Sequence, residues 1–416
     1  MIKILPKGSI VFFLLWIFFF SVSSFLEAKP KNEKAPRERV TGKQWNVEMK
    51  YVEPGMDLFN PVFSPDGKGM AFVHKGHVPD GGEAENMDIE QTDRMMKEVR
   101  KKNRETHFED PQVFIFDEGF KNKKMIGTGW APCFSPDGRR LAFVQQVKSL
   151  AGLRTLAATM EGNSIALYDR KTAKTKVLAT PQNGDFTKPF FSGDGNQVLY
   201  LSSIAVNGAY PGPIGLEKIN LKSGDKSFLV KPRKALTQPV LVDGYSISNG
   251  EVFTTLQIPA EFSFGFVQAY SYDLINASQK EKVIYSWGKQ MDETREFTPV
   301  FHAFSNRTVL VDDKGWKLMN IDTGKIVARP EGKNDLIYGV ISPDGKKIVG
   351  HKRDYQKDAQ GVFLMEIGNP TEEKILDLDS GDEVREMIWS PDSRKIAIAV
   401  SRSDFHDEIV IIKKRN

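Results

Sequence analysis

Cysteine is nearly absent from this chain of 416 residues, which contains only Cys133. One cysteine cannot form an intramolecular disulfide, so the fold has to be stable without such cross-links. A chain of this length can bury enough apolar surface to do so. The residues around Cys133 are Trp130, Pro132 and Phe134, which indicates a buried structural thiol rather than a reactive one.

An excess of charge of one sign is also absent. The chain has 58 basic and 54 acidic residues, which gives a net charge of +4. It is 40% hydrophobic and 27% charged, the balance of a soluble globular protein with a sizeable core. Such a balance argues against a nucleic acid as the partner.

The first 28 residues do not fit this globular composition. Lys3 and Lys7 are followed by the apolar stretch 10–20 and then by the small residues of 21–24. This is the layout of a secretory signal peptide. Cleavage is expected after Ser24 or Ala28.

An uncleaved membrane anchor is the alternative, because residues 10–26 approach the ~20 residues that a spanning helix needs. Either way, the sequence predicts that the bulk of the chain lies outside the cytoplasm, in the periplasm or at the cell envelope. Residues 29–44 form a charged linker between this segment and the globular part. Any membrane contact is expected through the N-terminal segment, if it is not cleaved.

Internal repetition is the strongest pattern in the sequence. A short apolar run leads into a Ser-Pro-Asp-Gly turn, and a second apolar run leaves it. The clear copies are 61–67 (PVFSPDG), 132–138 (PCFSPDG), 189–195 (PFFSGDG), 340–345 (VISPDG) and 388–393 (IWSPDS).

Two weaker copies complete the series, 247–250 (ISNG) and 299–302 (PVFH). After a longer first interval, the copies recur at spacings that scatter around the ~40–50 residues of a four-stranded propeller blade. The positions equivalent to the turn serine, called anchors below, are Ser64, Ser135, Ser192, Ser248, His302, Ser342 and Ser390.

Each unit predicts four antiparallel strands. Proline presets φ for the turn, aspartate bonds to nearby backbone N–H groups, and glycine takes the position with positive φ. The strand after the turn is continuously apolar, as expected where neighbouring sheets cover both of its faces. A polar turn then joins two further strands. The sequence therefore predicts an all-β propeller over residues 45–416.

The two ends of the repeat region complement each other. The last unit stops one strand short, after the apolar runs 396–400 and 408–412. Residues 45–52 form a lone strand before the first unit. Pairing this strand with the last unit would close the ring and leave no exposed edge. Seven blades are then expected, or six if one of the two weaker copies is not a blade of its own.

These repeats resemble those of TolB-type (WD40-like) propellers and of the propeller domains of prolyl-oligopeptidase-like enzymes. The resemblance covers about residues 45–416 and implies the fold. TolB carries an α/β domain ahead of its propeller, where this chain has only the linker 29–44. The oligopeptidases carry a hydrolase domain, yet Gly-x-Ser-x-Gly does not occur here, and the nearest string, 162–166 (GNSIA), lacks the last glycine. The resemblance therefore implies no catalytic residues.

Long connections gather at one end of the predicted strands, which points to a working surface there. The first of them, 78–111, begins acidic and ends basic and is predicted to form a short surface helix in the first blade, or a docking helix. Arginine, lysine and aromatic residues of these loops are the candidates for partner binding. With two histidines, they are Lys101, Lys102, Arg154, Tyr210, Phe262, Phe264, His351 and His406.

The sequence predicts neither a metal site nor a cofactor. His74, His351 and His406 could meet across the mouth of the ring, but no short zinc spacing and no cysteine pair accompanies them. The acidic run 377–383 lacks the spacing of a calcium loop and is expected to be a charged turn.

Two functions fit these observations. The first is an exported non-catalytic propeller that holds another protein, or a glycan, through the surface with the long loops. The alternative is a propeller enzyme, a lyase, lactonase or glycan hydrolase, with its site scattered over the same loops. A concave, charged mouth favours the enzyme, and a flat apolar mouth favours the binding protein.

Overall fold

The chain divides into two compact units, Met1–Glu38 and Arg39–Asn416, and all described residues belong to the second. The computed structural model describes residues 40, 44–54, 56–76, 110–146, 162–181, 184–204, 213–233, 240–246, 251–259, 270–288, 302–305, 308–312, 316–328, 336–354, 359–369, 371–402 and 406–415. These residues form antiparallel strands and one short 3-10 turn, η1 (Ala277–Gln279). Within these ranges, no helix is long and apolar enough to cross a membrane.

The first two units of the repeat share one seven-stranded sheet. Its long strand β5 pairs with β4 over its first half and with β6 over its second half, so it takes part in two successive four-stranded groups. In order, the strands are β2 (Met56–Phe63), β3 (Met70–Gly76), β4 (Gln112–Phe116), β5 (Lys123–Phe134), β6 (Arg140–Gln145), β7 (Ser164–Asp169) and β8 (Lys174–Ala179).

The remaining described strands form sheets of four. The third and fourth units contain β9 (Gly184–Phe191), β10 (Gln197–Ile204), β11 (Ile214–Asn220) and β12 (Lys226–Arg233), then β13 (Val240–Ser246), β14 (Val252–Pro259), β15 (Tyr270–Asn276) and β16 (Lys282–Gly288). The fifth and sixth contain β17 (His302–Ser305), β18 (Thr308–Asp312), β19 (Trp316–Asn320) and β20 (Ile326–Ala328), then β21 (Leu336–Ile341), β22 (Lys347–Asp354), β23 (Ala359–Glu366) and β24 (Glu372–Leu378).

Each of the two weaker repeats thus forms a four-stranded sheet. In one of them the predicted anchor, His302, is wrong. His302 does not end the first strand of its sheet but lies within β17, opposite Leu310 of β18, and β17 continues to Ser305. The reason is that the connection between the first two strands is shorter in this unit than in the Ser-Pro-Asp-Gly units.

The last sheet contains β1, which is the first strand of the described chain. β1 (Trp45–Pro54) pairs with β27 (His406–Lys414), and the order continues through β26 (Lys395–Ser401) to β25 (Glu383–Trp389). The pairing of residues 45–52 with the last unit, predicted from its missing strand, is therefore observed. It supplies β27 with the partner that it would otherwise lack.

The Ser-Pro-Asp-Gly turns use their polar atoms internally, as predicted. In the first turn the hydroxyl of Ser64 donates to Asp66 Oδ1 at 2.5 Å, and the same oxygen accepts from the backbone N–H of Lys68 at 3.0 Å. Gly67 has a positive φ of 67°. The same two bonds recur in the turns that contain Ser135, Ser192, Ser342 and Ser390.

The outer hairpin of a unit lies at the same end as its serine turn. A backbone bond joins the two in several sheets, for example from Gly119 to Lys68 and from Arg170 to Arg139. We call this end of the sheets the turn face. The opposite end, where the second strand of each unit ends and the third begins, is the loop face.

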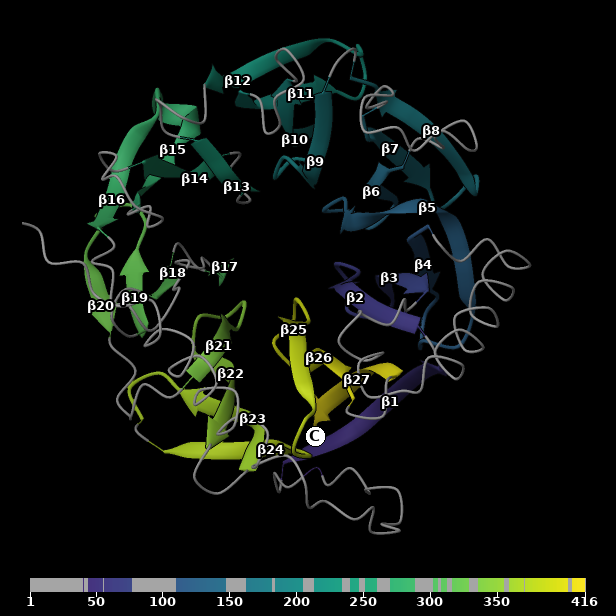
Figure 1. Cartoon of the computed structure of the whole chain (residues 1–416), viewed down its shortest axis with the longest axis vertical. Helices are drawn as coiled ribbons and strands as arrows, with labels where there is room; N and C mark the ends of the chain where they lie inside the picture. Colours follow the sequence, from purple (N-terminus) through teal and green to yellow (C-terminus); the bar gives the residue numbers. More distant parts are fainter. Residues whose placement is uncertain are drawn as a thin grey trace, which may run out of the picture. The chain divides into compact units, whose positions relative to one another are not determined.

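Apolar side chains of neighbouring sheets form the core. One cluster joins the first and last sheets, where Leu58 and Phe72 pack with Ala397 and Ile409. The second strands β3, β6 and β26 are buried along almost their whole length, because sheets cover both of their faces. In Figure 1 the sheets of this unit stand side by side around a centre, with β2, β9 and β25 toward it and β8, β12 and β16 outside.

The described residues therefore form the all-β propeller that the repeats predict. The number of blades, seven or six, and the closure of the whole ring stay predictions.

Candidate functional site

The inner strands share a bulge four residues before the anchor serine. Asn60, Ala131 and Lys188 occupy this position in β2, β5 and β9, with φ of 49°, 51° and 49°. The strand register shifts at each of these points, and in β25 it shifts just before the equivalent Glu386. Left-handed backbone is uncommon for residues other than glycine, and a bulge changes the direction of a side chain. The bulges thus mark a position that recurs in the strands nearest the centre around which the sheets stand.

Hydrogen bonds connect these bulges from one sheet to the next. The Oε2 atom of Glu386 accepts from the backbone N–H of Asn60 at 2.7 Å and from its side-chain Nδ2 at 3.4 Å. In turn, Oδ1 of Asn60 accepts from the N–H of Ala131 at 3.3 Å. One chain of bonds therefore links β25, β2 and β5 and fixes the orientation of the Glu386 carboxylate.

The environment of Glu386 changes its acidity. Burial raises the pKa of its carboxyl above the ordinary glutamate value, and the two donors on Asn60 act in the opposite direction. The residue is half-buried rather than enclosed. A carboxyl with a raised pKa can both hold and release a proton closer to neutral pH, which makes Glu386 a candidate for proton transfer.

A guanidinium lies beside this carboxyl on the same strand. Nη1 of Arg385 is 3.1 Å from Asp407 Oδ2 and 3.4 Å from Asp57 Oδ1. The same Oδ2 of Asp407 accepts from the N–H of Leu58 at 2.9 Å. Burial raises the pKa of Asp407, against the effect of the Leu58 N–H and Arg385. Two carboxylates thus surround one guanidinium at the loop face, where β27 begins.

A second group of ion pairs lies next to the group of Arg385, Asp57 and Asp407. Arg402 pairs with Asp382 at 2.6 Å and with Glu408, whose side chain is fully buried. Glu408 also pairs with Lys50 of β1 at 2.6 Å. Asp382 accepts in addition from the N–H of Asp379 at 3.0 Å. These bonds hold the start of β27 and the turn before β25, the two places from which Asp407 and Arg385 extend.

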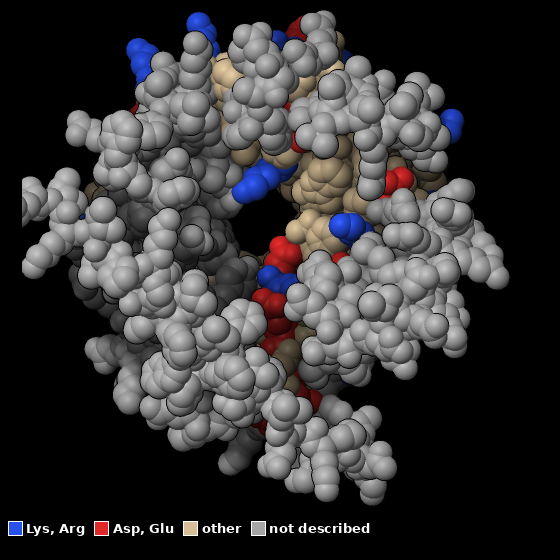
Figure 2. All heavy atoms as spheres, in the orientation of Figure 1, with Lys and Arg blue, Asp and Glu red and all other residues tan. Residues whose placement is uncertain are grey.

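Figure 2 shows a hollow at the centre of the molecular face, with charged side chains at parts of its described edge. Acidic and basic groups lie together at its edge over β25, and a further basic group lies over β9. The charged residues of these strands are Glu383, Arg385 and Glu386 in β25, and Asp185 and the exposed Lys188 in β9. The described edge of this hollow therefore carries both acidic and basic groups, beside uncharged residues.

Most of the partner-binding residues expected from the sequence cannot be placed. Lys101, Lys102, Arg154, Tyr210, Phe262 and Phe264 lie outside the described residues, as does the expected helix apart from residues 110 and 111. His406 begins β27 opposite Pro54. His351 lies in β22 and is only 5% exposed, so its imidazole offers a partner little surface.

The described ranges contain no group of three or more histidine, cysteine or acidic side chains that could hold a metal ion. His74 is buried in β3 with its ring against Phe114. In the acidic run 377–383, Asp377 pairs with Lys374 at 2.7 Å. Burial raises the pKa of the Cys133 thiol to about 11, which keeps it protonated at neutral pH.

Sequence reasoning missed Glu386, Asn60 and Arg385. No local motif contains them, since Asn60 and Glu386 are 326 positions apart. A usable signal was present, because aligning the repeats places Asn60, Lys188 and Glu386 at one position, four residues before the anchor. Polar residues at equivalent places of inner strands indicate a ring of side chains around the centre.

No family model and no curated protein matches the chain. Solved structures do. An oligogalacturonate lyase in complex with manganese has a TM-score of 0.55 and 12% identity, and the match covers 91% of this chain and 96% of the lyase. For the oligogalacturonate lyase of Vibrio parahaemolyticus the TM-score is 0.52 at 11% identity, with the same coverage.

The β-propeller domain of the trilobed protease from Pyrococcus furiosus is similar as well, with a TM-score of 0.51, 11% identity and coverage of 88% of this chain and 96% of that domain. At these identities the comparisons show the fold alone. They confirm a β-propeller, whereas the TolB-type part of the resemblance stays a prediction.

Proposed function

We propose that the protein is a propeller enzyme that acts on a glycan at the loop-face end of the central hollow. The observation that carries this proposal is Glu386, a carboxyl with a raised pKa that is fixed by Asn60 from the neighbouring sheet. Carboxyl groups of this kind are typical of sites that transfer protons. A site assembled from distant strands also accounts for the missing local motif.

Each residue of the site has a role in this proposal. Glu386 transfers a proton to or from the sugar, and Asn60 holds its carboxyl in place. Asp57 accepts hydrogen bonds from sugar hydroxyls, because carboxylate oxygens accept several bonds at once, whereas Asp407 is only 3% exposed and holds Arg385 in place. Arg385 limits the mutual repulsion of these carboxylates, at 3.1 Å and 3.4 Å from them.

The similar structures support an enzyme in a limited way. Two of them are oligogalacturonate lyases, each matched over nearly the whole length of both chains. By contrast, the acylaminoacyl peptidase of Pyrococcus horikoshii is covered only over 49% of its length. The match therefore extends over nearly the whole length of the lyases and over about half of the peptidase. The charges of the described mouth favour a hydroxyl-rich substrate over a strongly acidic one.

The direct test is turnover by the full chain of a panel that contains oligogalacturonate and neutral oligosaccharides. Mass spectrometry of the products separates the reactions, because hydrolysis adds water to the fragments and elimination does not. Glu386→Gln keeps the shape of the side chain but removes proton transfer, so we expect turnover to fall about a hundredfold. The pH profile of the parent should show an inflection above the ordinary glutamate value of about 4.3.

Glu383→Gln is the matched control, because Glu383 is an exposed glutamate on the same strand. This variant should retain the parent activity. If the parent turns over none of the panel, or if Glu386→Gln is as active as Glu383→Gln, the proposed function is wrong.

The protein-binding role that the sequence also allows stays a prediction.

We also propose export, on the basis of the N-terminal segment. A fusion of residues 1–44 to a reporter that is active only outside the cytoplasm should give signal, and the mature protein should begin near Phe25 or Lys29. An intact Met1 in the membrane fraction would instead identify an anchor, and a cytoplasmic protein would contradict both.

A further inference from the structure

The chain enters the propeller at the turn face. β1 begins there, with Trp45 opposite Lys414, and the backbone N–H of Arg415 donates to the carbonyl of Gln44 at 2.6 Å. The N–H of Lys414 bonds at 2.9 Å to the carbonyl of Arg394, which belongs to the serine turn of the same sheet. β1 therefore starts beside Arg415, at this face.

Basic side chains are concentrated in two parts of the turn face. Arg394, Lys414 and Arg415 belong to the last sheet, and the outer hairpin of β7 and β8 adds the exposed Lys171, Lys174 and Lys176. The carboxylates on these elements are fewer, and they bond within their own turns: Asp169 accepts from Thr172, and Asp392 from Ser390. The charge of the lysines and arginines is thus only partly balanced.

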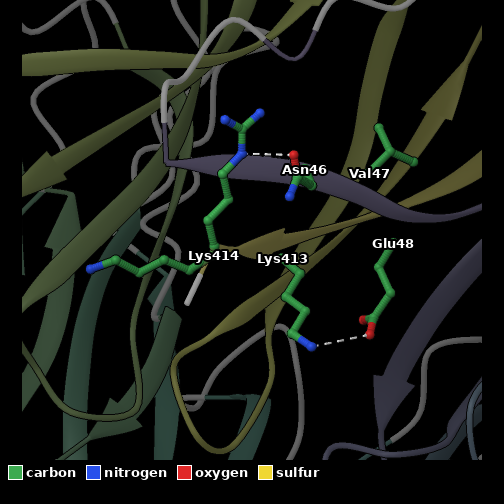
Figure 3. A pocket seen from close by; sticks show the side chains of 6 residues that line it. Asn46, Val47, Glu48, Lys413 and Lys414 are labelled. Atoms are coloured by element: carbon green, nitrogen blue, oxygen red, sulfur yellow. Dashed lines mark hydrogen bonds and ion pairs between the residues drawn. The ribbon is translucent and has the colours of Figure 1, made fainter.

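A pocket of about 290 Å³ lies where β1 and β27 meet at this face. Lys413, Lys414 and Arg415 contribute to its lining (Figure 3). Its carboxylate, Glu48, lies 3.8 Å from Lys413 and 2.9 Å from Lys395. Lys414 points away from Glu48 in the same view.

Lys414 also has a cation for a neighbour. The pKa of Lys347 in the adjoining sheet is lowered by burial and by the positive charge of Lys414. The carboxylates of Glu366 and Asp344 act on the pKa of Lys347 in the opposite direction. With Lys413, Lys414 and Arg415 in the pocket, basic groups of two adjoining sheets thus lie near the start of β1.

We infer that the turn face binds the surface of a membrane rich in anionic phospholipids. Basic residues spread over several sheets match an extended anionic surface better than a single small anion. In the sequence, the segment that precedes β1 also contains basic residues, namely Lys29, Lys31, Lys34, Arg37 and Arg39, after the apolar stretch 10–26. The inference does not depend on the proposed enzyme, and it leaves the loop face directed away from the membrane.

The test is lysine acylation of the full-length protein, with whichever N-terminus the cell leaves on it. It is mixed with vesicles of phosphatidylcholine alone or with about 30 mol% phosphatidylglycerol, and the rates are read by peptide mass spectrometry. Lys171, Lys174 and Lys176 should react at least about threefold more slowly with the anionic vesicles at about 0.1 M salt, and the protection should disappear at high salt. Lys75 and Lys231, at the ends of strands on the loop face, should react equally with both.

The triple variant Lys171→Glu, Lys174→Glu, Lys176→Glu provides the control, because all three side chains are exposed and their reversal leaves the core intact. It should lower the protection of Lys414 by the anionic vesicles. Equal rates with the two kinds of vesicle, or protection of Lys75 and Lys231 instead, would overturn the inference. Protection by soluble polyphosphate but not by vesicles would assign the face to a soluble polyanion and overturn it as well.

Discussion

Deleting residues 41–53 should destabilise the propeller by several kcal/mol, because β1 stabilises the last sheet in two ways. It pairs with β27 from Trp45 to Pro54, so its loss would leave a row of unpaired backbone groups on a buried apolar strand. It also contributes Trp45, which is 1% exposed and packs against Trp389 with ring centroids 6.3 Å apart. Loss of a buried tryptophan side chain alone typically costs about 3–5 kcal/mol.

The measurement is denaturant and thermal unfolding of the deletion variant, followed by circular dichroism. Two single substitutions divide the effect. Trp45→Ala should account for a large part of it, whereas Val52→Ala, in the same strand but 37% exposed, should change the stability by less than about 0.5 kcal/mol. A deletion variant with the midpoint of the parent would show that β1 is not part of the cooperative unit.

This strand also shows why much of the fold was predictable from the sequence. The repeated Ser-Pro-Asp-Gly turns determine local backbone conformation, and the bonds among Ser64, Asp66 and Lys68 are those that such residues are expected to form. Continuous apolar runs identify the second strand of each unit. The missing strand of the last unit then leaves β1 as its natural partner. The turns and the second strands thus follow from local residue preferences, and the pairing of β1 follows from the need to cover a sheet edge.

The candidate site was not predictable in the same way. Asn60 accepts from Ala131 and donates to Glu386, but these contacts depend on the bulges of three inner strands and on how adjacent sheets pack. A bulge has no residue signature here, because asparagine, alanine and lysine all adopt the left-handed conformation at it. The long loops, where the sequence predicts a working surface, lie largely outside the described residues, whereas the described site lies at the inner strands.

The grouping of basic residues on the turn face is not visible in the sequence for a related reason. The polar atoms of the serine turns are indeed used within the turns, as the sequence suggested. However, Lys171, Lys174 and Lys176 of an outer hairpin are exposed, whereas the neighbouring Arg170 donates to the carbonyl of Gly138 in a serine turn at 2.9 Å. A net charge of +4 over the whole chain conceals this uneven distribution. Only the topology shows which basic residues share a face.

Replacing Glu408 should have the other large effect on stability. Its side chain is fully buried, and it pairs with Arg402, which is itself only 10% exposed, and with Lys50 at 2.6 Å. Removing one partner of a buried pair leaves the other charge buried without compensation, at a cost of about 3–5 kcal/mol. We expect this loss for Glu408→Ala and a large fraction of it for Glu408→Gln, measured by urea unfolding.

A matched pair of variants separates burial from charge. Glu48 also bridges β1 to neighbouring lysines but is exposed, so Glu48→Gln should cost no more than about 1 kcal/mol. The double variant Glu408→Met, Arg402→Met removes both buried charges together, and it should recover much of the stability lost in Glu408→Ala. Asp382 would then lose its partner Arg402, so the recovery should be incomplete unless Asp382→Asn is added. If Glu408→Gln unfolds at the urea concentration of the parent, the pairs with Arg402 and Lys50 do not stabilise the attachment of β1, and this account of the last sheet fails.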